Sequence, residues 1–275
     1  MAYMIGIDIG GSTTKIVGLQ DGSLAGACSV RASDPVTSAY GAFGKFLTDW
    51  HLNLTSVDKV MFTGVGSSFL QGQQIYGIPT RKVDEFRAIG LGGRYISGLE
   101  KCIVVSMGTG TAITSVSDGE IHHVCGTGVG GGTILGLGER LCASHSFSHL
   151  LELAKSGDLG NVDLAVGDIT HDQLSNMQNK TTASNFGKIS DNAGASDLAL
   201  GLLNMVFQTV GTFAMMAARP RGMRDIVLTG TLACMDLARP ILNELEELYD
   251  VRYLVPEHAD FATAIGAAIL GEQER

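Results

Sequence analysis

Residues 5–16 read IGIDIGGSTTKI, and residues 106–113 read SMGTGTAI. In both stretches an apolar run leads into a short turn of glycine, serine and threonine, and a second apolar run follows. This pattern predicts two β-hairpins with small polar tips. Glycine lets the backbone approach a ligand closely, and exposed amide groups stabilise anionic oxygens. The repetition therefore predicts two related halves that face one ligand.

Further glycine turns extend the pattern along the chain. The tract 126–132 (GTGVGGG) precedes a predicted helix from Thr133, and the predicted strand 225–229 ends at Gly230 and Thr231. No GxxxxGK[ST] motif occurs, which excludes the common P-loop class of ATPases. The tract 126–132 satisfies GxGxxG, but no acidic residue closes a following strand about 20 residues later, so a dinucleotide-binding fold is not favoured.

The remaining hydrophobic patterns predict the elements around the hairpins. Helical spacing covers 38–51 and 84–97, a buried strand covers 59–64, and helices are expected from Ala233 and over 261–270. The sequence thus predicts an α/β protein.

The length of the chain predicts two unequal domains, because 275 residues exceed the usual size of one compact domain. We expect the first domain at residues 1–98 and the larger second domain at 99–275. The last helix, at about 261–271, is expected to pack back toward the first domain.

Composition narrows the class of protein. The net charge of −9 disfavours nucleic acid as a partner, because a polyanion is repelled. The five cysteines form no CxxC pair, which fits reduced thiols rather than a disulfide framework or a zinc site. Residues 1–12 lack a basic segment followed by an apolar core, so we expect no signal peptide and a cytoplasmic protein.

The stretch 198–218 contains no charged residue and is about as long as a membrane span. Asn204 and Gln208 interrupt it, and no aromatic belt flanks it. We therefore expect a buried helix between domains or subunits, and no membrane span.

The hairpin residues suit a nucleoside triphosphate with magnesium. A carboxylate such as Asp8 prefers hard cations and would hold Mg²⁺, in most such sites through water. Lys15 adds a positive charge toward the phosphates, and hydroxyl donors are available at Ser12, Thr13, Thr109 and Thr111. Taken alone, each hairpin is more simply explained as an ordinary tight turn, and Asp8 as a cap or turn residue.

The order of these motifs resembles the phosphate-1, phosphate-2 and adenosine motifs of the sugar kinase, Hsp70 and actin superfamily. Within it, the chain resembles the type II pantothenate kinases over nearly its whole length. The matching stretches are GIDIGGSTTKIV, VDEFRAIGLGG, SMGTGTAI, VCGTGVGGGTILGLG, LAKSGD, TTASNFGK, DIVLTGTL and FATAIGAAIL. The resemblance implies an actin-like (ribonuclease H-like) fold with an ATP cleft between two related domains. It also implies a homodimer that uses ATP to phosphorylate the terminal hydroxyl of pantothenate, the first step of coenzyme A biosynthesis.

The resemblance further assigns roles to residues. Glu85 corresponds to the family's general base on the acceptor side, and Asp8 to its magnesium residue. The implied nucleotide contacts are Asp8, Ile9, Gly10, Gly11, Ser12, Thr13, Thr14, Lys15, Thr109, Gly131, Gly132, Thr133, Ile134, Leu135, Phe147 and Thr231. Two of these assignments have simpler alternatives, since Glu85 also suits the first turn of a helix and Phe147 also suits a core.

One departure from the family concerns the acceptor. The family often has an arginine just before its glycine loop, where this chain has His122 and His123. If His123 contacts the substrate, it brings a shorter, titratable donor in place of a permanent guanidinium. His145 and His149 are four residues apart, but no HExxH motif accompanies them, so a metal site there is not favoured.

Three other functions remain open from the residues. An ATP-driven dehydratase activator needs two cysteines per subunit for an iron–sulfur cluster, and no second cysteine follows Cys125 at the expected distance. A kinase of amino sugars keeps the chemistry but usually has an aspartate base in another setting than VDEFRA. A nucleotide-dependent scaffold related to actin would transfer phosphate to no small acceptor.

Overall fold

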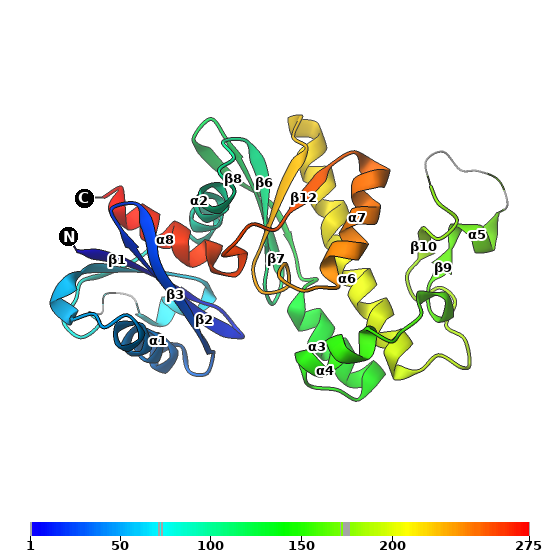
Figure 1. Cartoon of the computed structure of the whole chain (residues 1–275), viewed down its shortest axis with the longest axis horizontal. Coiled ribbons are helices and arrows are strands. Elements are labelled where there is room, and N and C mark those ends of the chain that lie inside the picture. Colours follow the sequence, from blue (N-terminus) through cyan, green and yellow to red (C-terminus); the bar gives the residue numbers. More distant parts are fainter. Residues whose placement is uncertain (1, 71, 73, 171, 173–176, 275) are drawn as a thin grey trace.

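The structure is a computed structural model that describes residues 2–70, 72, 74–170, 172 and 177–274. Figure 1 shows two α/β domains side by side, with helices α2 (Glu85–Ser97) and α8 (Ala262–Glu272) between their sheets. A small excursion extends from the second domain at the end far from the chain termini.

The first sheet has the strand order β3-β2-β1-β4-β5. Strands β1, β2 and β3 are antiparallel, and β4 and β5 continue parallel to β1. Helix α1 (Pro35–Asp49) packs Phe43 and Phe46 on one face, and α8 covers the other. The strands are β1 (Tyr3–Ile9), β2 (Thr13–Gln20), β3 (Ser23–Arg31), β4 (Val57–Thr63) and β5 (Thr80–Lys82).

The second sheet has the order β12-β11-β6-β7-β8, which repeats the topology of the first. Again three antiparallel strands, β6, β7 and β8, are followed by two strands parallel to the first of them. The strands are β6 (Cys102–Met107), β7 (Thr111–Ser117), β8 (Glu120–Thr127), β11 (Asp225–Thr229) and β12 (Arg252–Leu254). The predicted duplication into two related halves is thus confirmed.

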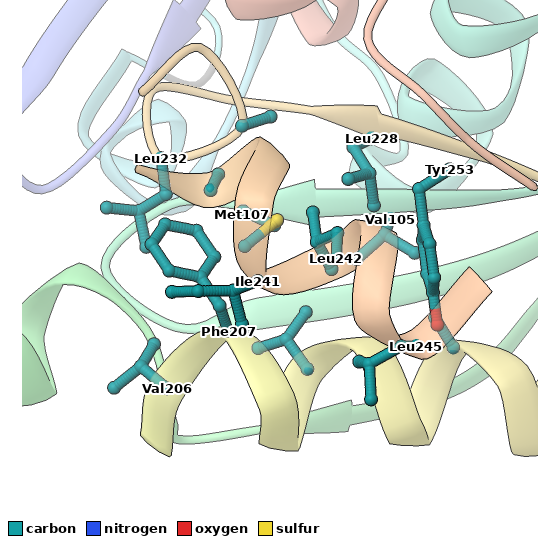
Figure 2. Close-up of a cluster of buried hydrophobic side chains, with 14 of the residues drawn as sticks. Val105, Met107, Val206, Phe207, Leu228, Leu232, Ile241, Leu242, Leu245 and Tyr253 are labelled. Carbon is teal, nitrogen blue, oxygen red and sulfur yellow. The ribbon is translucent and has the colours of Figure 1, made fainter. Parts of the chain in front are cut away.

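The larger core lies between the second sheet and helices α6 (Ala195–Ala218) and α7 (Ala238–Tyr249). Figure 2 shows Phe207 of α6 and Leu242 of α7 packing toward Met107 of β6. Helices α3 (Gly131–Cys142) and α4 (Phe147–Ala154) extend this core. The excursion contains β9 (Leu164–Ala165), α5 (Val166–Ile169) and β10 (Thr182–Ser184).

Two predicted helix starts differ from the structure. The helix expected from Ala233 begins only at Ala238, because Ala233 and Met235 donate to Gly230 and Leu232 in successive turns that bury Leu232 under the sheet. The helix expected from Thr133 begins two residues earlier, at Gly131.

Helix α6 and its continuation, Ala195–Arg221, are long and apolar enough to cross a membrane, but 61% of the most apolar window is buried inside the protein. The polar interruptions have partners, since Asn204 Nδ2 donates to Asp163 Oδ2 over 2.7 Å and Gln208 Nε2 donates to Thr182 Oγ1 over 3.2 Å. These contacts tie the excursion to α6, as expected for the core helix of a soluble protein.

Helices α2 and α8 touch each other through small residues. A Cβ at Gly92 would lie 1.8 Å from the carbonyl oxygen of Ala262, so the two backbones are in direct contact. Helix α8 packs on β1, β2 and β4, whereas α2 packs on β6, β7 and β8. We therefore propose a domain boundary between β5 and α2 rather than at residue 98, with α8 returning to the first domain.

Candidate active site

Asp8 and Lys15 lie opposite each other where β1 and β2 approach the first hairpin tip. Lys15 is only 8% exposed, and Asp8 is partly buried. Burial raises the pKa of the Asp8 carboxyl, and the positive charge of Lys15 offsets only part of that rise. The ionised carboxylate is therefore under-compensated within the protein, and this suits a site for a hard cation.

The turn after β4 encloses the Asp8 carboxylate. Gly64 has a φ of 84°, and a Cβ there would lie 2.4 Å from Asp8 Oδ1. Thr63 pairs with Asp8 in the parallel ladder, and its buried hydroxyl has no hydrogen-bond partner among the described residues. The sequence placed Gly64 at the end of a predicted strand, but it did not place this residue against Asp8.

Glu85 is the first residue of α2. The side chain of Asp84 caps the helix by accepting from Arg87 N over 2.8 Å, which fixes the helix start and hence the position of Glu85. Burial raises the pKa of Glu85, and the negative charges of Asp8 and then Asp84 add to the rise, while Lys82 opposes it. The charge interaction indicates that Asp8 and Glu85 lie near each other.

The tips of the two glycine hairpins lie close to each other. A Cβ on Gly11 would lie 3.2 Å from Thr109 Oγ1, so the first hairpin tip touches the second. The glycine loop is bound to the second hairpin as well, because Gly131 N and Gly132 N donate to the carbonyls of Gly108 and Thr109, each over 2.8 Å. These two amides hold the loop in place and are not free for a phosphate.

The polar side chain in the first turn of α3, that of Thr133, forms its hydrogen bonds with the neighbouring backbone. The Thr133 hydroxyl accepts from Gly130 N and donates to the carbonyl of Gly128, each over 3.2 Å. The Ile134 side chain is fully buried, and Leu135 packs against the same core. Only the backbone of these residues is therefore available to a nucleotide.

Other predicted nucleotide contacts divide between exposed turns and the two cores. Thr231 is exposed directly after Gly230, whose φ is 88°. By contrast, the Thr14 side chain is fully buried on the face of the first sheet toward α1, together with its ladder partner Ile9. Phe147 is partly buried and packs against the second core. The remaining residues of the first tip, Gly10, Ser12 and Thr13, line the hairpin turn itself.

His123 stacks on Phe86, the residue that follows Glu85. The ring centroids are 3.9 Å apart, with an interplanar angle of 24°. The analysis of the sequence named His123 but missed Phe86, although Phe86 is in helical register with Gly90 on the face of α2 that meets the second sheet.

Histidine pairs elsewhere form no metal site in the described part of the chain, where no group of three or more His, Cys, Asp or Glu side chains converges. His149 Nδ1 lies 2.9 Å from Ser144 Oγ, and His145 lies 3.5 Å from Glu139. A metal held at Asp8 would therefore take its other ligands from water and from a bound phosphate.

Comparisons with known proteins show the family of this chain. Residues 37–269 match the model of the family described as Fumble. The chain is 31% identical to a type II pantothenate kinase of Bacillus anthracis over 86% of each chain. It is also 31% identical to a type II pantothenate kinase of Oceanobacillus iheyensis over 96% of this chain and 98% of the relative.

Solved structures with similar folds are more distant in sequence. Component A of (R)-2-hydroxyglutaryl-CoA dehydratase from Acidaminococcus fermentans superposes with a TM-score of 0.70 at 18% identity, covering 100% of this chain and 99% of its own. A ROK family glucokinase from Streptomyces griseus, in complex with glucose and AMPPNP, gives a TM-score of 0.62 at 11% identity, covering 99% and 100%. These likenesses show the actin-like ATPase and sugar kinase fold.

Proposed function

This chain belongs to the Fumble family, and we propose that it is an ATP-dependent pantothenate kinase, the enzyme that begins coenzyme A biosynthesis. Its curated relatives named above are type II pantothenate kinases. The observation that carries the proposal is the electrostatic interaction between Asp8 and Glu85, beside two glycine hairpins whose tips approach each other closely. One carboxylate is thus available for a metal and another for an acceptor.

Glu85 is the proposed general base. A primary hydroxyl is a poor nucleophile at neutral pH, so a carboxylate that accepts its proton during attack on the γ-phosphate assists the reaction. The raised pKa of Glu85 brings this base closer to neutrality, where proton transfer is more effective. Its place on α2 leaves Asp8 free for the metal.

The nucleotide side is proposed to consist of the first hairpin, Gly10 to Lys15, and of Thr109 and Thr231. Lys15 adds positive charge toward the phosphates, and Asp8 would hold Mg²⁺, which neutralises developing charge on the phosphate oxygens when it is bound. We propose backbone contacts alone for Ile9, Thr14 and residues 133–135, because these side chains are buried, packed against the core or already hydrogen-bonded. Gly131 and Gly132 have no side chain and their amides are bound to the second hairpin, so their proposed contact is the close approach of the nucleotide to their backbone. For Phe147 we propose a packing role in the second core and no contact with the nucleotide.

The acceptor side is proposed to lie between Glu85 and His123. Both side chains belong to elements that meet at the first turn of α2, where Phe86 stacks on His123. An imidazole donates or accepts one hydrogen bond at each ring nitrogen, so His123 suits a polar group of pantothenate.

The rival functions are supported by a likeness of fold alone. A dehydratase component and a sugar kinase both superpose on this chain. Their sequence identities to it are too low for a shared activity to be inferred from the shared fold. The match to Fumble covers most of the chain, and relatives above 30% identity carry the kinase name. Pantothenate is therefore favoured over an amino sugar or a protein partner.

The protein is proposed to work as a cytoplasmic homodimer that binds neither nucleic acid nor membrane. Helix α6 is buried on most sides, yet Phe213 is 42% and Met216 is 60% exposed. A second copy of the chain would cover such an apolar strip. Sedimentation at micromolar concentration should give a dimer, and Met216→Asp should weaken it; a monomeric wild-type protein would contradict the proposal.

An acceptor screen tests the function. The purified protein, with ATP and Mg²⁺, is offered pantothenate, N-acetylglucosamine and no acceptor, and ADP and phosphorylated product are quantified. Product from pantothenate alone is expected. ADP release that is equal with and without acceptor would favour an ATPase, and sugar phosphate as the main product would favour the other kinase class.

A further inference from the structure

We propose that Phe86 is a positioning residue that orients His123 toward the acceptor. This inference rests on the proposed function, because it deepens the acceptor side of the same cleft. Its starting point is the stack between the two rings, with centroids 3.9 Å apart and planes 24° from parallel.

The stack lies at the end of a row of close contacts between α2 and the second sheet. Phe86, Gly90 and Gly93 follow one another at helical spacing on the face of α2 toward this sheet. A Cβ at Gly90 would lie 2.5 Å from Cγ2 of Ile121, so the helix is pressed against β8 at that point. Ile121 and His123 are two residues apart on β8, so their side chains lie on the same face of the sheet. This spacing brings His123 under Phe86.

This end of the row is open to solvent, unlike its middle. Gly90 is buried, whereas Phe86 is 37% exposed and His123 is exposed. On its other side, His123 Nε2 would lie 3.9 Å from a Cβ at Gly126, at the head of the glycine loop. The imidazole therefore lies between the helical turn that carries Glu85 and the loop that is bound to the second hairpin.

The physical role of the ring follows from this exposure. A solvent-exposed histidine side chain samples several rotamers. Binding of an acceptor to it therefore includes the entropic cost of fixing the side chain in one rotamer. A stacked aromatic ring contributes about 0.5–1.5 kcal/mol to one orientation of its neighbour. Because Phe86 is covalently next to Glu85, the same helical turn sets the base and the plane of the imidazole relative to each other.

A double-mutant cycle tests the inference on the full-length enzyme. The Michaelis constants for pantothenate and for ATP are measured in wild type, Phe86→Leu, His123→Ala and the double variant. Phe86→Leu should raise the KM for pantothenate about 2- to 12-fold, with the KM for ATP unchanged. In the His123→Ala background the same change should have little further effect, because the ring it orients is gone.

Two controls separate positioning from packing. Phe86→Tyr keeps a stackable ring and should retain the wild-type KM for pantothenate. His122→Ala removes the neighbouring imidazole, which pairs with Glu120 at 3.2 Å, and should leave the KM unchanged. If Phe86→Leu does not fold, Phe86→Met enters the cycle in its place.

Two results would overturn the inference: a normal KM for pantothenate in Phe86→Leu, or an equal loss from this change with and without His123. Failure of the proposed function is distinguishable, because the wild-type enzyme would then not phosphorylate pantothenate at all. In that case the cycle is run with the alcohol that the acceptor screen identifies.

Discussion

Asp8 and Glu85 are far apart in the sequence, yet the negative charge of Asp8 adds to the rise that burial causes in the pKa of Glu85. Asp8 lies near the end of β1 in the first domain, and Glu85 begins α2, which packs on the second sheet. The proposed metal residue and the proposed base are therefore coupled electrostatically, and a cation held by Asp8 would also lower the pKa of Glu85.

Asp8→Asn should abolish turnover and yet stabilise the nucleotide-free protein at neutral pH. The folded-state pKa of Asp8 is raised above its ordinary value of 3.8, so ionisation destabilises the native state as the pH rises above that value. The gain from Asn should therefore be absent below about pH 3.8 and grow toward neutrality. Urea unfolding from pH 4 to pH 8 measures this change.

Asp168→Asn is the control of opposite sign for this measurement. A hydrogen bond from Lys188, and then one from Ala165 N, lower the pKa of Asp168, so neutralising it should destabilise the protein at pH 7. For the Asp8→Asn variant itself, a turnover rate equal to that of the wild-type enzyme would show that Asp8 is not part of the active site.

Glu85→Gln should lower kcat by about 10²–10⁴-fold, because the amide keeps the size of the side chain but cannot accept the proton. Nucleotide binding should be nearly intact, as measured by calorimetry with a non-hydrolysable analogue. In the wild-type enzyme, the acid limb of the rate profile should have its midpoint above the ordinary carboxyl pKa of 4.5. Loss of ATP binding in the variant would instead assign Glu85 to the nucleotide side.

Gly64→Ala should both destabilise the protein and impair turnover. The positive φ costs a Cβ residue about 1–2 kcal/mol, and the new methyl group would meet the Asp8 carboxylate. Gly119→Ala is a matched control, because Gly119 has a φ of 80° but nothing within 4 Å of its Cβ position. The Gly119→Ala variant should lose a similar free energy of unfolding, from the backbone strain alone, and should keep its activity. Equal activities of the two variants would contradict the contact with Asp8.

Thr63→Val should leave the stability of the nucleotide-free protein unchanged or raise it slightly. Within the described residues the Thr63 hydroxyl is buried without a partner, so removing it relieves a desolvation cost. Thr229→Val is the comparison, since Thr229 Oγ1 is equally buried but donates to the carbonyl of Val105 over 3.1 Å. That variant should lose about 1 kcal/mol. Equal losses on thermal unfolding would show that the Thr63 hydroxyl has a partner, such as an ordered water.

Much of the fold could be predicted because its signals are local. Alternating apolar runs around glycine turns predicted both hairpins, and Asp84 marks the start of α2 as the side chain that caps it. The predicted start of α7 was wrong, because the turns that follow Gly230 bury Leu232 through tertiary contacts. Hydrophobic periodicity does not report such contacts.

The candidate site was predictable as a set of motifs but not as an arrangement. The motif that includes Thr14 and Lys15 does not say which side chain faces the cleft, and the sheet places Lys15 beside Asp8 and Thr14 toward α1. Phe86 was missed because its significance depends on a strand much later in the chain.

The sequence by itself determined the β-hairpins, the glycine turns, most helices and the membership of a family, because these depend on residues within a few positions of one another or on a pattern of motifs along the chain. The tertiary structure alone decided that Asp8 lies against Gly64 and near Glu85, and that Phe86 stacks on His123. Such contacts join separate segments, and their distances are set by the packing of two sheets against α2 and α8, where glycine and alanine let the backbones touch.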